Sequence, residues 1–162
     1  MKPRLLVSAC LLGTPCRYDG REKGSEAVRA LAGHFDLIPV CPEVLGGLPT
    51  PRLPSERRGG QITAKDGRDV TEAYRRGAEA ALELAQREGT AAAVLKSRSP
   101  SCGSGEIYDG TFTGTLTAGD GVTTALLRAH GIRVYSEEAE NLAELCRSFG
   151  VCPTCFLTSG RI

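Results

Sequence analysis

The sequence is poor in aromatic residues, in histidine and in net charge. Its 162 residues contain no tryptophan, four phenylalanines and two histidines, and the formal net charge is only +1. So small a net charge gives no reason to expect a nucleic acid or a membrane as a partner. No apolar run approaches the length that spans a bilayer, and no secretory leader is recognisable at the start. These absences predict a cytoplasmic protein, and the composition favours a bacterial source.

Cysteine, by contrast, is abundant, with seven residues in the chain. In a reducing compartment such cysteines are more typical of metal ligands or catalytic thiols than of disulfides, and an odd number does not suit a fully paired framework. The length and an apolar content of 41% suit a domain with a real hydrophobic core. We therefore expect a single domain over residues 1–162, with residues 151–162 as a C-terminal tail.

Hydrophobic patterning predicts an α/β fold. Short apolar runs indicate strands at residues 4–8, 35–40, 91–95 and 132–135. Helical spacing and capping residues indicate helices over residues 25–32, 71–88, 122–129 and 139–149. The alternation of strands and helices is typical of a mainly parallel, Rossmann-like sheet with helices on both faces.

The segments between these elements are predicted as loops. Residues 42–60 hold four prolines and four glycines, which favours an extended loop over a helix. Residues 62–70 contain an Asp-Gly turn and resemble a hairpin or an extended approach to the next helix, which Thr71 is expected to cap. A second long loop is expected over residues 97–119.

Cys10, Cys41 and Cys102 each follow a predicted strand. Because the carboxyl ends of parallel strands meet at one edge of a sheet, where open α/β folds bind ligands, we expect these thiols to lie together. Their spacing matches neither the C-x-x-C pairs of zinc fingers nor the tight runs of ferredoxins. A zinc-based or thiol-based binding module stays open as an alternative, with Cys16 as the nearest fourth zinc ligand.

Several motifs surround these cysteines in a fixed order. They are Val-Ser-Ala-Cys-Leu-Leu-Gly at 7–13, Cys-Arg-Tyr-Asp-Gly at 16–20, Pro-Val-Cys-Pro-Glu at 39–43, Gly-Gly-Leu at 46–48, Pro-Arg at 51–52, Ser-Pro-Ser-Cys-Gly at 99–103 and Ile-Tyr-Asp-Gly-Thr-Phe at 107–112. Together they resemble the TudS-type thiouracil desulfurase family, formerly a family of unknown function. The resemblance runs from about Leu5 to Ser136.

This resemblance implies an oxygen-sensitive 4Fe–4S cluster held by Cys10, Cys41 and Cys102, one iron of which has no protein ligand. That open iron takes sulfur from a thiolated pyrimidine base or nucleoside, and hydrogen sulfide is released without redox chemistry. A soft metal with an open position favours sulfur, which agrees with this chemistry. A sulfur transferase that acts on tRNA or on a small acceptor is an alternative use of the same iron.

Further residues near the cysteines are predicted to act on the substrate. Glu43 is our candidate acid/base, although it could simply pair with an arginine. Ser99 and Ser101 flank Cys102 and are expected to donate hydrogen bonds or relay a proton, and Tyr108 could stack on a pyrimidine. Lys96 could favour a thiolate at Cys102 or form an interior ion pair. Four arginines are expected either to form a solvated rim or to bind an anionic group. They are Arg17, Arg52, Arg57 and Arg58.

The remaining cysteines receive other interpretations. Cys16 is expected to be structural, and Cys146 falls on the apolar stripe of the last predicted helix, which places it in the core. Cys152 and Cys155 form a C-x-x-C pair, which by itself is a weak signal, and we assign it no role.

Overall fold

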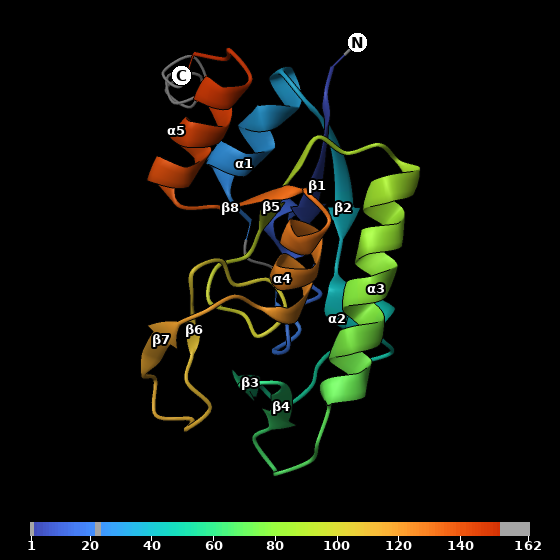
Figure 1. Cartoon of the computed structure of the whole chain (residues 1–162), viewed down its shortest axis with the longest axis vertical. Helices are drawn as coiled ribbons and strands as arrows, with labels where there is room; N and C mark the ends of the chain where they lie inside the picture. The colour runs from blue at the N-terminus through green and yellow to red at the C-terminus, as the bar shows by residue number, and fades with distance from the viewer. Residues whose placement is uncertain (1, 22–23, 153–162) are drawn as a thin grey trace.

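The computed structural model describes residues 2–21 and 24–152 (Figure 1). Its centre is a parallel sheet with the strand order β2–β1–β5–β8. The strands are β1 (Arg4–Ser8), β2 (Asp36–Val40), β5 (Ala92–Leu95) and β8 (Arg133–Ser136). The predicted α/β class with a mainly parallel sheet is therefore confirmed.

Strand β1 lies inside the sheet and is buried on both faces. Leu6 pairs with Ile38 of β2 and with Ala93 of β5. Leu5, Leu6 and Val7 have no exposed surface. Strands covered on both faces are continuous apolar runs rather than alternating ones, which is why these short runs are recognisable in the sequence.

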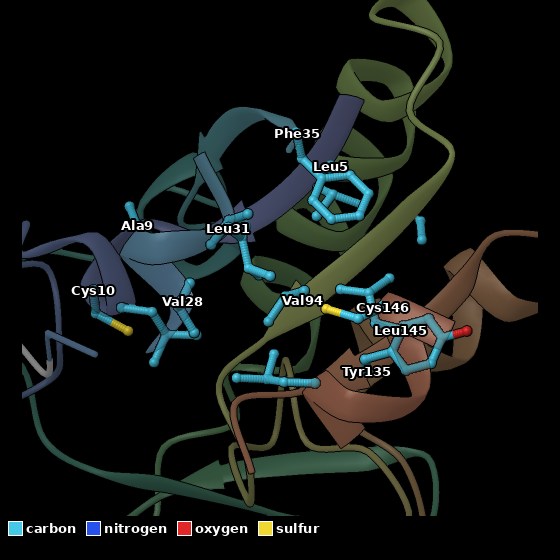
Figure 2. Packing of buried hydrophobic residues seen from close by; sticks show 14 of the residues in the cluster. Leu5, Ala9, Cys10, Val28, Leu31, Phe35, Val94, Tyr135, Leu145 and Cys146 are labelled. Atoms are coloured by element: carbon cyan, nitrogen blue, oxygen red, sulfur yellow. The ribbon is translucent and has the colours of Figure 1, made fainter. Parts of the chain in front are cut away.

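Helices α1 (Glu26–Ala30) and α5 (Ala139–Ser148) cover one face of the sheet. The predicted N-cap is present, because the Ser25 hydroxyl accepts a hydrogen bond from the Val28 N–H at 3.3 Å. Figure 2 shows the core of this face, in which Cys146 and Leu145 pack near Tyr135. Cys146 is fully buried, as predicted.

Helices α3 (Thr71–Arg87) and α4 (Val122–Ala129) cover the opposite face (Figure 1). Thr71 was expected to cap α3, and this is wrong, since it is the first residue inside the helix. Its N–H and its hydroxyl instead both donate to Asp69 Oδ1, at 2.9 and 2.6 Å. An aspartate two residues before the helix therefore supplies the acceptor that a capping side chain would provide.

The prediction of a plain loop over residues 42–60 is wrong. The segment contains the short helix α2 (Pro42–Leu45) and the strand β3 (Ser55–Arg58), which pairs with β4 (Gln61–Ala64). Proline is well suited to the first turn of a helix, because no intrahelical bond is needed from its nitrogen there. The Asp-Gly turn at residues 66–67 does form, since the Ala64 N–H donates to the Arg68 carbonyl at 2.9 Å.

The predicted loop over residues 97–119 also contains regular structure. Strands β6 (Glu106–Tyr108) and β7 (Leu116–Ala118) pair as an antiparallel hairpin. Both this hairpin and β3–β4 lie beyond the carboxyl ends of the parallel strands (Figure 1). Within the described ranges, no helix is both long enough and apolar enough to cross a membrane.

Candidate active site

A cavity of about 750 Å³ opens at the carboxyl edge of the sheet. Cys10 lies in a 3-10 helix (Ala9–Leu12) directly after β1, Cys41 follows β2, and Cys102 lies in the loop after β5. All three line the cavity, and Cys16 joins them from the loop that follows Cys10. The structure thus brings together the cysteines that the sequence analysis singled out, along with a fourth.

The Cys41 and Cys102 thiols of the cavity favour their protonated forms. Burial, and next the Glu43 carboxylate, raise the pKa of Cys102 to about 12. A hydrogen bond with Cys16 and burial raise the pKa of Cys41. Thiolates at these positions therefore need a cationic partner, and binding of a thiophilic metal releases their protons.

The donor set is one of soft sulfur ligands, which suits iron or another thiophilic metal. In the part of the chain that the structure describes, no three histidine, cysteine, aspartate or glutamate side chains are close enough to hold a single metal ion. Thiols that come from three separate segments and line one cavity supply the sulfur ligands that a metal cluster needs.

The loop that carries Cys102 is fixed by hydroxyl groups. The Ser99 hydroxyl accepts from the N–H groups of Ser101 and Cys102, each at 3.0 Å. Ser101 is 1% exposed, and its hydroxyl bonds to that of Thr123 at 2.8 Å. The Thr124 hydroxyl donates to the Cys102 carbonyl at 2.9 Å. Ser99 thus shapes the turn and lines the cavity, whereas Ser101 connects the turn to α4.

Glu43, from α2, lies on the cavity wall between two fixed partners. It accepts a short hydrogen bond from the Tyr74 hydroxyl and forms an ion pair with Arg52 at 3.2 Å. The Arg52 side chain is only 5% exposed, so a solvated-rim interpretation is wrong for this arginine. Burial lowers the pKa of Arg52, but the Glu43 carboxylate outweighs it and the pKa lies above its ordinary value.

Glu43 owes its position to close packing of α2 on α3. A Cβ atom at Gly77 would lie 1.9 Å from the Pro42 carbonyl oxygen, and one at Gly46 would lie 2.0 Å from that of Ala73. Both positions therefore exclude any side chain. The glycine inside a helical pattern is the signal in the sequence that could have revealed this contact.

An ion pair forms another part of the cavity wall. Lys96 Nζ lies 2.9 Å from Glu137 Oε1, and the N–H and the hydroxyl of Ser97 donate to Glu137 at 2.9 and 2.7 Å. Of the two roles considered for Lys96, the structure shows the ion pair. Sequence analysis missed Glu137, although it follows a predicted strand just as the cysteines do.

The hairpins close the cavity on the side away from the sheet. Glu56 of β3, Tyr108 of β6 and Phe112 in the β6–β7 loop all line it. Tyr108 was singled out from the sequence as a stacking residue, whereas Glu56 and Phe112 were missed. Nothing in the local pattern around residue 56 indicates that it faces a loop from another hairpin.

The fold and the site together define a class of protein: α/β proteins with cysteine thiols at the carboxyl edge of a parallel sheet, where the thiols can ligate a metal group. A family model for 2-thiouracil desulfurase matches residues 5–140. The chain belongs to this family.

The chain is also similar to two individual proteins. The chain is 46% identical over 147 residues to the uncharacterized protein YbbK of Bacillus subtilis (strain 168), a match that covers 85% of this chain and 97% of YbbK. It is also similar to the solved structure of the 4Fe–4S-dependent thiouracil desulfidase TudS, at 52% identity and a TM-score of 0.84. That similarity covers 92% of this chain and 99% of the TudS chain.

Proposed function

We propose that this protein is a 4Fe–4S-dependent desulfurase that removes sulfur from a thiolated pyrimidine such as 2-thiouracil. The observation that carries the proposal is the meeting of Cys10, Cys41 and Cys102 in a cavity of a chain 52% identical to TudS. The net reaction adds water to the substrate and releases hydrogen sulfide. A carbon–oxygen bond replaces a carbon–sulfur bond, so no oxidant or reductant is consumed.

Cys10, Cys41 and Cys102 are the residues that would hold the cluster. Three thiolates on a four-iron cluster leave one iron without a protein ligand. When bound, such a cluster supplies a thiophilic Lewis acid for the substrate sulfur. Cys16, which lines the same cavity, is not needed for this ligand set.

In this proposal, Glu43 moves the proton of the reacting water. Its carboxylate lies on the cavity wall, and the Arg52 guanidinium and the Tyr74 hydroxyl hold its orientation. It accepts the proton as water attacks the carbon that carries sulfur, and returns it to the leaving sulfur or the ring nitrogen. Ser99 and Ser101 serve this step by holding the loop of Cys102 in place.

The proposal also includes the location of the protein, its domain organisation and the size of its substrate. We infer a single cytoplasmic domain that acts on a small thiolated base or nucleoside. The described cysteines from Cys10 to Cys146 are free thiols, which supports a reducing compartment. The net charge of +1 offers little attraction for a tRNA substrate.

The test begins with anaerobic purification and analysis of iron, sulfide and zinc. We expect about four irons and four sulfides per chain, lost when Cys10, Cys41 or Cys102 is replaced by alanine. The exposed Cys152→Ser variant is the control and should keep its iron. Zinc without iron after anaerobic reconstitution would overturn the proposal.

The second stage measures the reaction itself. The loaded protein should convert 2-thiouracil to uracil and release an equal amount of hydrogen sulfide. Glu43→Gln should keep its iron and lose roughly 10²–10⁴-fold in kcat, the range expected for removal of an acid/base. A loaded protein that releases no sulfide from thiolated pyrimidines would contradict the assignment.

A further inference from the structure

Phe112 is held beside the cavity in a rare backbone conformation. Its φ of 57° lies in the left-handed region, which is a genuine outlier for a bulky side chain. Such conformations persist only where the surroundings impose them, and they concentrate at functional sites.

Glu56 imposes the conformation from the other hairpin. Its Oε1 atom accepts hydrogen bonds from the N–H groups of Gly110 and Phe112, at 3.0 and 3.2 Å. The loop is braced on its own side as well, because the N–H and the hydroxyl of Thr111 donate to Asp109 Oδ1 at 2.9 and 2.6 Å. Contacts from two hairpins thus hold the backbone of Phe112.

The Phe112 ring has no place in the hydrophobic core. The core clusters on the two faces of the sheet do not include it, and the residue is half-buried where it lines the cavity. Tyr108, on the same hairpin, also lines the cavity. The hairpin therefore brings aromatic rings to a cavity whose base carries thiols and Glu43, an arrangement suited to a flat ring whose reacting edge meets polar groups.

We propose that Phe112 is a substrate-positioning residue whose ring stacks on the thiolated heterocycle, and that Glu56 acts through it by holding the loop. This inference rests on the proposed function and makes it more specific. It predicts that the enzyme prefers a planar, aromatic thiocarbonyl ring to an acyclic thioamide such as thioacetamide. Loss of the Phe112 ring should weaken that preference.

The decisive variant is Phe112→Gly. Glycine suits the positive φ, so the variant removes the ring without straining the loop, and thermal unfolding should occur no lower than in wild type. In the cluster-loaded enzyme we expect KM for 2-thiouracil to rise about tenfold at nearly unchanged kcat, the pattern of lost uniform binding. The KM for thioacetamide should change less than about twofold by comparison.

Binding to the metal-free protein provides a readout that does not depend on the cluster. Calorimetric titration with 2-thiouracil should show affinity reduced about tenfold in Phe112→Gly. Phe112→Tyr keeps the ring and should bind within about twofold of wild type. If Phe112→Gly binds and reacts like wild type, the stacking assignment is overturned.

Glu56 is tested by the contrast between two substitutions. Glu56→Ala removes the acceptor of both N–H groups and should reproduce the KM increase, whereas Glu56→Gln keeps an oxygen and should restore most of the affinity. Gly60→Ala, on the adjoining turn with nothing within 4 Å of the added atom, is the control. Equal losses in Glu56→Gln and Glu56→Ala would overturn the positioning role.

These outcomes separate the inference from the proposed function. A wild-type protein that neither binds nor converts 2-thiouracil overturns both. A wild-type protein that converts it, together with a Phe112→Gly variant of unchanged KM, overturns the stacking assignment alone.

Discussion

At the scale of single residues, the ion pair between Arg52 and Glu43 is mostly buried. Their side chains are 5% and 18% exposed. Arg52 also donates to the Cys16 carbonyl at 3.0 Å, so one guanidinium connects the candidate acid/base to the cysteine loop. Among the buried side-chain nitrogen and oxygen atoms of the described residues, only Arg52 Nε has no hydrogen-bond partner. A buried polar group without a hydrogen-bond partner is costly, so Arg52 is held at this position against a free-energy penalty.

Removal of Arg52 should therefore destabilise the protein strongly. Arg52→Met leaves a mostly buried carboxylate without its cation, and we expect a loss of about 3 kcal/mol in the free energy of unfolding. The measurement is urea denaturation of the metal-free protein under reducing conditions. Arg75→Met is the matched control, since its pair with Glu72 is 62% and 64% exposed and should contribute less than about 0.5 kcal/mol. Equal losses in the two variants would contradict this prediction.

The Glu137 carboxylate should make stability depend on pH. Burial by itself raises the pKa of Glu137. The Ser97 hydroxyl and the Lys96 ammonium together lower this pKa by more than burial raises it, so the net pKa lies below the ordinary 4.5. A folded-state pKa below the unfolded one stabilises the fold above about pH 4.5, and this contribution is lost as the pH falls through the folded pKa.

The test compares urea denaturation of wild type and Glu137→Gln over a series of pH values. The difference in unfolding free energy should stay constant between about pH 5 and pH 7 and shrink at lower pH. A difference that persists undiminished to about pH 3 would show that the ionised carboxylate is not the stabilising form.

At the scale of elements, the position of α2 against α3 decides where Glu43 lies. The helices touch through backbone at Gly46 and Gly77, with no room for a Cβ atom at either. Helix propensity alone would favour alanine over glycine by about 1 kcal/mol within α3. Tertiary packing overrides this preference, because the neighbouring carbonyl occupies the space.

Gly77→Ala should for this reason be destabilising in spite of the better helix former. Overpacking of this kind costs about 1–3 kcal/mol, and displacement of α2 should lower kcat by up to about a hundredfold through misplacement of Glu43. Thermal unfolding and steady-state kinetics measure the two effects. Gly60→Ala, where the added atom meets nothing within 4 Å, serves again as the control. A Gly77→Ala variant more stable than wild type would refute the packing argument.

The accuracy of the sequence-based predictions differed from one element to another. The helix Val122–Ala129 was predicted at its observed bounds, and the parallel strands within one or two residues. The hairpins β3–β4 and β6–β7 were missed, because strands of three or four residues are too short for an alternating pattern to stand out. These hairpins close the cavity, so Glu56 and Phe112 were missed with them, although Tyr108 was singled out.

At the scale of the whole molecule, a cluster held by the three proposed cysteines would connect segments that follow three different strands. A group that binds only the folded state stabilises it by mass action, typically by about 3 kcal/mol at a hundredfold excess over Kd. We expect a Tm several degrees higher for the loaded than for the metal-free protein. Circular dichroism is the appropriate measurement, since the chain has no tryptophan. Cys102→Ala, exposed to the same reconstitution, should show no such increase, and an equal increase would argue against Cys102 as a ligand.

The sequence by itself determined the α/β class, the cysteines that follow strands and the family motifs around them. These features depend on local periodicity and on residues adjacent in the chain. Only the tertiary structure decided that Arg52 pairs with Glu43, that α2 rests on α3 and that Glu56 binds Phe112, which lies 56 residues away. Contacts between such distant segments depend on how the elements pack in space, and no local pattern of residues specifies that packing.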